Sequence, residues 1–117
     1  MKIYEYLTFK TNNLEEILII LKKVHNQKIN IFHSFKSLQW QGPQFVKSLE
    51  DKIKDCDINF IVESNTDIGL TLALIEIGIK KISISNSLDK KVLTKIKSIA
   101  KKKDVNILFT EKFKKIE

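Results

Sequence analysis

The sequence predicts an α/β fold: three layers around a mostly parallel five-stranded sheet, flavodoxin-like in outline. Short apolar segments alternate with helical ones at a period of about 25 residues, and the connections are short. Each crossover is a helix, so the strands should run parallel. Three Gly and one Pro are too few for a turn-rich β-sandwich. The chain of 117 residues is too short for an eight-unit barrel, which needs roughly 200 residues or more. A half-barrel that completes itself by dimerising is the alternative.

The elements follow from hydrophobic patterning along what we expect to be one domain, residues 1–117. Apolar, β-branched and aromatic runs predict strands at 3–9, 29–32, 58–62, 79–84 and 105–109. Apolar stripes at helical spacing predict helices at 14–24, 43–56, 68–77 and 88–103. Residues 33–42 are expected to form a long irregular loop, and the last eight residues a charged tail.

Cap residues support these helices. Asn12 is the expected N-cap of the first helix, and Glu15, three residues later, completes a capping box. Asn65 or Thr66 is the expected cap of the third helix. Gly78 follows the same helix at the position that favours a left-handed backbone.

The formal charge of +7 comes entirely from lysine, since none of the 21 basic residues is Arg. Lysine, together with 19 Ile and few Gly or Pro, indicates drift in an A/T-rich genome. A protein selected to read bases or clamp phosphates generally keeps Arg, whose planar fork binds bidentately. Nucleic acid is therefore a disfavoured partner, and its one plausible surface is the lysine face of helix 88–103.

No segment predicts a membrane span, because no apolar run reaches roughly 18 residues. The first residues lack the apolar run of a signal peptide, so we expect a cytoplasmic protein. The single Cys56 is expected to be a small buried residue. No metal site is expected, since His25, His33 and Cys56 show no paired spacing. No cofactor is expected either, because the glycine-rich phosphate-binding motifs are missing.

The carboxyl ends of parallel strands are where ligands bind in open α/β sheets. All five predicted strands end in polar residues, and the loop with Trp40 leaves from the same edge. The candidate ligand-binding residues are His33, Trp40, Glu63, Asn65, Ser85 and Asn86. We expect them to share one pocket under an aromatic loop, although Asn and Ser at such positions are commonly helix caps.

His33 and Glu63 form the one pair in this set with acid–base chemistry. We expect them on adjacent strands, close enough for a base and an orienting carboxylate. No nucleophile completes a triad, so no catalytic residue is assigned.

Three segments resemble a small family of uncharacterised alphaproteobacterial proteins. They are Gly42-Pro43-Gln44-Phe45, Ile61-Val62-Glu63-Ser64-Asn65 and the apolar run 69–79. The family has an aromatic-containing helix after a Gly, an acidic-Cys-Gly turn after a strand, and an Ala/Leu-rich helix. Here Glu63-Ser64-Asn65 replaces that turn, so chemistry based on its Cys is not expected. The resemblance implies a bacterial, cytoplasmic setting and no activity.

These observations leave three hypotheses on function. The first is a non-catalytic domain that acts through self-association, as a homodimer or larger homo-oligomer, or through another protein. It rests on the nearly all-round apolar helix 68–77 and on the loop with Phe35, Leu38 and Trp40. The second is a small-molecule enzyme or sensor at the carboxyl edge, and the third is nucleic-acid binding.

Overall fold

The computed structural model describes residues 2–24 and 27–117, and His25 lies outside them. Its five strands are β1 (Thr8–Thr11), β2 (Ile29–His33), β3 (Ile58–Asn65), β4 (Lys81–Ile84) and β5 (Asn106–Phe109). Its helices are α1 (Leu14–Lys23), α2 (Phe35–Gln41), α3 (Pro43–Ile53), α4 (Ile68–Ile77) and α5 (Lys90–Lys102), with 3₁₀ helices η1 (Lys2–Glu5) and η2 (Thr110–Lys112).

The predicted class is confirmed, because all five strands pair in parallel in one α/β sheet. The strands follow chain order, β1-β2-β3-β4-β5, as the half-barrel alternative expects. Flavodoxin itself has the order 2-1-3-4-5, in which a reversal opens a ligand crevice. A sheet in chain order has no such reversal.

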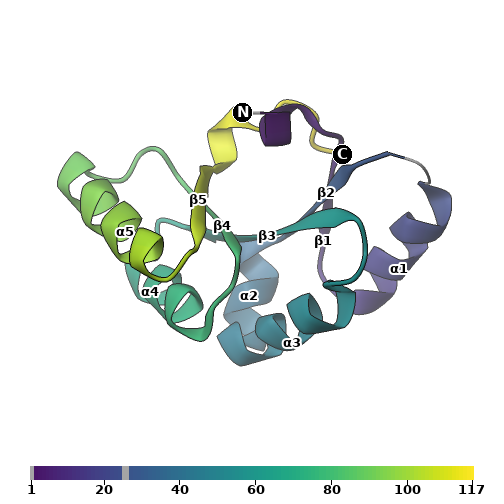
Figure 1. The fold of residues 1–117 in the computed structure, drawn as a ribbon, viewed down its shortest axis with the longest axis horizontal. Helices are drawn as coiled ribbons and strands as arrows, with labels where there is room; N and C mark the ends of the chain where they lie inside the picture. The colour runs from purple at the N-terminus through teal and green to yellow at the C-terminus, as the bar shows by residue number, and fades with distance from the viewer. Residues whose placement is uncertain (1, 25–26) are drawn as a thin grey trace.

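The two faces of the sheet are covered by different kinds of layer. Right-handed crossovers that always step in one direction place every helix on the same face. A single apolar core accordingly joins all five helices to strand residues such as Ile31, Val62 and Ile82. Figure 1 shows the helices along the outer side of the curved sheet and the two chain ends on its inner side.

The chain ends are held on the inner face by a small aromatic core. The ring of Phe113 meets those of Tyr4 and Phe32 edge-on, at centroid distances of 4.8 and 5.4 Å. The tail also pairs with the edge of β1, where the N–H of Thr8 donates to the carbonyl of Lys115 (2.8 Å). The predicted charged tail thus carries a parallel bridge between Thr8 and Ile116.

A row of buried polar side chains in the sheet supports the layer that the two chain ends form on its inner face. Asn30 donates to the backbone carbonyl of Ile3 (2.7 Å) and to the hydroxyl of Thr8 (3.0 Å). Asn59 in turn donates to Asn30 (3.0 Å). Each buried amide therefore has a partner, which removes most of the cost of burying it.

Two segments were assigned the wrong secondary structure. Residues 2–5 form η1 rather than a strand, because Tyr4 packs against Phe113 and its hydroxyl accepts the N–H of Phe109 (3.0 Å). Tertiary contacts thus override the local strand propensity. Residues 35–41 form α2 rather than an irregular loop, because Ser34 caps it by accepting the N–H of Ser37 (3.2 Å).

The caps of α1 and α4 lie beyond the residues expected. Asn13 caps α1 by accepting the N–H of Glu16 (2.9 Å), and Glu16 accepts the N–H of Asn12 (2.6 Å). The cap therefore lies one residue later than predicted, and Glu16 accepts the N–H of the residue before the cap rather than that of the cap itself, as a capping box would require. Asp67 caps α4 by accepting the N–H of Leu70 (2.9 Å).

Three other sequence features have clear outcomes. Gly78 has the predicted left-handed conformation, at φ 86°. Cys56 is exposed rather than buried, because it lies in the turn between Ile53 and Ile58, beyond the end of α3. Over 2–24 and 27–117, no helix has the length and apolar character needed to span a membrane.

Candidate functional site

The carboxyl edge of the sheet holds five of the six predicted ligand-binding residues. His33 ends β2, Glu63 and Asn65 are among the last three residues of β3, and Ser85 and Asn86 directly follow β4. These residues lie in two separate clusters: the first lies after β1 and β2 and includes Glu63 of β3, and the second joins the end of β3 to the segments after β4 and β5.

His33 is at the centre of the first cluster. Its ring is fully buried, and Nε2 lies 2.7 Å from Oε1 of Gln41. The amide nitrogen of Gln41 donates to the carbonyl of Asn12 (2.7 Å), so Oε1 is the acceptor and His33 carries its proton on Nε2. Burial lowers the pKa of His33, while Gln41 and the nearby charge of Glu16 oppose this. The ring is therefore held neutral.

Glu63 stabilises the start of α2. One carboxylate oxygen accepts the backbone N–H of Phe35 (3.0 Å), a group at the helix N-terminus that has no partner within the helix. Within the described part of the chain, no hydrogen bond joins Glu63 to His33. The two side chains lie on neighbouring strands, as expected, but each has a separate structural partner.

Asn65, Ser85 and Asn86 belong to the second cluster, together with Glu111. The carbonyl of Asn65 accepts the N–H of Ser85 (3.1 Å) where the register of β3 and β4 shifts. Asn65 has φ 56°, a left-handed conformation that Asn tolerates better than most residues. The carboxylate of Glu111 accepts the hydroxyl of Ser85 (2.7 Å) and the N–H of Asn86 (2.9 Å).

The pKa of Glu111 reflects two opposed effects. Partial burial alone would raise it, whereas the hydrogen bonds from Asn86 and Ser85 stabilise the charged form and lower it overall. This carboxylate therefore ties the loops after β4 and β5 together in its ionised form.

Trp40 does not cover the other candidates. It lies on α2 with 85% of its surface exposed, so the expected aromatic lid over the carboxyl edge is not formed. A helix of seven residues, with Leu38 turned fully inward, places Trp40 on its outer side.

Sequence reasoning missed three partners of these residues: Asn12, Gln41 and Glu111. Asn12 and Glu111 both follow strand ends, so the rule that selected the other candidates could have included them. Gln41 gives no such signal, because its contact with His33 depends on α2.

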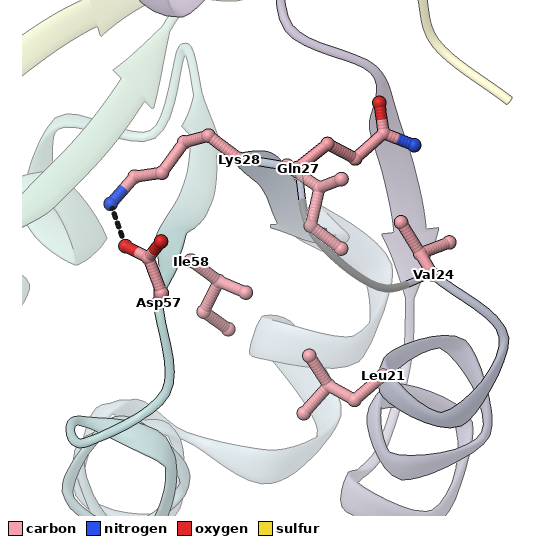
Figure 2. Close-up of a pocket in the computed structure, with 7 residues that line it drawn as sticks. Leu21, Val24, Gln27, Lys28, Asp57 and Ile58 are labelled. Atoms are coloured by element: carbon pink, nitrogen blue, oxygen red, sulfur yellow. Dashed lines mark hydrogen bonds and ion pairs between the residues drawn. The ribbon is translucent and has the colours of Figure 1, made fainter.

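The sequence also gave no indication of a hollow at the opposite, amino edge of the sheet. It has a volume of about 550 Å³ and lies between the end of α1 and the starts of β2 and β3. Figure 2 shows Leu21 and Ile58 extending toward one another across it, while Lys28 reaches Asp57 in an ion pair of 2.7 Å. The one lysine that lines this hollow is thus already paired with a carboxylate.

The outer side of the helical layer exposes large apolar side chains. Besides Trp40, Phe45 of α3 is 48% exposed, and Ile68 and Leu72 of α4 are 41% and 39% exposed. The helix α3 packs against both α2 and α4, so these side chains belong to adjacent helices. We call this set the Trp40 face: Trp40, Phe45, Ile68 and Leu72.

No group of three or more potential ligands that could hold a metal ion occurs in segments 2–24 and 27–117. No protein-family model matches the chain, and comparison with curated proteins gives no significant match.

Proposed function

We propose that this protein is a non-catalytic α/β domain that self-associates, and that two copies contact each other through the Trp40 face. The single observation that carries the proposal is the exposure of Trp40, 85% of whose surface faces solvent on a helix. An indole ring gains much from leaving water, and Trp is enriched among residues that dominate binding energy at interfaces.

The Trp40 face is suited to a two-fold contact. Its four side chains are uncharged, and the exposed Lys36 lies one helical turn from Trp40 on α2. The apolar centre of the contact therefore places no like charges against one another, and Lys36 lies at its rim. A two-fold axis puts the same patch on both subunits, and an apolar patch is complementary to itself. A stable interface buries about 800 Å² per partner, so the contact extends beyond these four side chains over α2, α3 and α4.

The edges and inner face of the sheet are poorer surfaces for self-association. The tail pairs with β1 through Ile116, and Tyr4 and Phe113 occupy the inner face. At the other edge, Lys97 and Lys112 lie over the ring of Phe109, at 4.9 and 5.1 Å. Charged side chains at an edge strand disfavour pairing with another chain. Completion of a barrel by dimerisation is therefore a less favoured mode than contact through the helices.

Sedimentation velocity over a concentration series tests the proposal. We expect a reversible dimer, and we expect Trp40→Ser to weaken it by about thirtyfold, the effect of losing a central interface residue worth about 2 kcal/mol. The matched control is Ile19→Ser, which removes an apolar side chain that is 46% exposed on α1. It should leave the dissociation constant unchanged.

Two results would refute self-association through this face. One is a wild-type protein that stays monomeric up to protein concentrations on the order of 1 mM. The other is a Trp40→Ser variant that dimerises as tightly as the wild type.

A further inference from the structure

A second hollow lies at the amino edge of the sheet, where β3 and β4 begin. It has a volume of about 340 Å³. Ile58 lines both this hollow and the hollow in Figure 2, so the two are adjacent. Its apolar lining comes from Ile58, Phe60 and Ile53, of which the last two are nearly buried. A hollow of this size is within the range of small-molecule sites, which are generally apolar with a few polar groups.

The charged lining of this hollow is unbalanced. It consists of four lysines and two carboxylates: Lys47, Lys54, Lys80, Lys81, Glu50 and Asp51.

Both carboxylates are already bound. Lys47 forms ion pairs with Glu50 (2.8 Å) and Asp51 (3.2 Å). The other oxygen of Glu50 accepts the backbone N–H of Lys80 (2.9 Å), and only 7% of Glu50 is exposed. Glu50 therefore ties α3 to the start of β4, and it has little capacity left to attract a cation.

The other three lysines have no such partner. Across 2–24 and 27–117, no carboxylate lies within ion-pair distance of Lys54, Lys80 or Lys81. Four lysines and two carboxylates give the lining a net charge of +2, and three of its ammonium groups lie beside the apolar lining without an ion-pair partner.

We propose that this hollow binds a small organic anion, with an aromatic or branched apolar body against Phe60, Ile53 and Ile58 and a carboxylate or phosphate among the three free lysines. The apolar body supplies binding energy by leaving water. The lysines select a ligand with a negative charge, because their flexible ammonium groups attract anions as point charges. The site shares no residue with the Trp40 face, so it does not depend on self-association.

Titration of ¹⁵N-labelled protein with matched small molecules tests the site by amide chemical shifts. Phenylacetate is the anionic probe, and phenylacetamide has nearly the same shape without the charge. Phenyl phosphate keeps the phenyl body and replaces the carboxylate by a phosphate, and whichever anion binds more tightly identifies the preferred group. We expect an anion to shift the amides of Ile58, Phe60 and Lys80, and the acetamide to bind about tenfold more weakly than the acetate.

The triple variant Lys54→Gln/Lys80→Gln/Lys81→Gln separates charge from apolar contact. We expect it to bind the preferred anion about tenfold more weakly, since each exposed charge contributes a modest amount. Lys90→Gln/Lys91→Gln/Lys95→Gln removes the same charge from α5, where these three lysines line a different hollow. This control should bind as the wild type does.

The proposal is overturned if neither anion shifts the amides around Phe60 at millimolar concentration. It is also overturned if the acetamide binds as tightly as the acetate, or if both triple variants lose affinity equally.

Discussion

His33 shows how a residue with catalytic chemistry can have a structural role. Its Nε2 donates to Gln41, and among the described residues its buried Nδ1 has no hydrogen-bond partner. The neutral ring is therefore the form compatible with the fold, because a second proton would be buried without an acceptor.

This arrangement predicts an acid-dependent loss of stability. The pKa of His33 is lowered from 6.5, so the unfolded chain binds a proton at a pH where the folded protein does not. The free energy of unfolding should accordingly be highest above pH 6.5 and fall as the pH decreases from there to the lowered pKa. The slope is at most about 1.4 kcal/mol per pH unit for one proton.

Urea denaturation between pH 5 and 8 measures this effect, with His33→Gln as the comparison. The variant lacks the titrating ring, so its curve should be flatter in the same range. If wild type and variant have parallel pH profiles, His33 is not held neutral by its surroundings.

At the scale of elements, the sequence predicted four of the five α-helices, and the one it missed positions the candidate site. Helices α1, α3, α4 and α5 have ten or more residues, long enough to show a periodic apolar stripe. The seven residues of α2 are too few. The partners that α2 provides, Gln41 to His33 and the N–H of Phe35 to Glu63, were therefore not predictable from spacing.

The junction of α2 and α3 gives the prediction at this scale. Gly42 has φ 84° and ψ 159°, a conformation nearly restricted to glycine, and it ends one helix and begins the next. A Cβ there meets nothing within 4 Å, so backbone strain alone sets the cost of Gly42→Ala. We expect about 1–3 kcal/mol of destabilisation in urea denaturation.

The matched control is Gly69→Ala, in the first turn of α4. Its backbone φ is ordinary, and a Cβ there makes only van der Waals contact, at 3.5 Å from Asp67. This variant should be more stable by about 0.4–1 kcal/mol, since alanine reduces the entropy of the unfolded chain. Equal effects of the two substitutions would contradict the conformation described for Gly42.

At the scale of the molecule, the alternation of strands and helices in the sequence was enough to predict a parallel sheet but not the order of its strands. Each crossover must be right-handed, yet a new strand can join either edge of the sheet with that hand. The order depends on tertiary packing, here of all helices on one face and of Tyr4 and Phe113 on the other. The same packing closes the inner face, and it leaves the Trp40 face as the open apolar surface of α2, α3 and α4.

Trp40 is the only tryptophan in the chain, so its fluorescence reports directly on that face. At low concentration the emission should be that of an indole in water, because Trp40 is 85% exposed. Self-association through the Trp40 face predicts a blue shift as the protein concentration rises, parallel to dimer formation in sedimentation. An emission maximum that stays at the water-exposed position while dimers form would contradict the account, as would an emission maximum typical of a buried indole in the monomer.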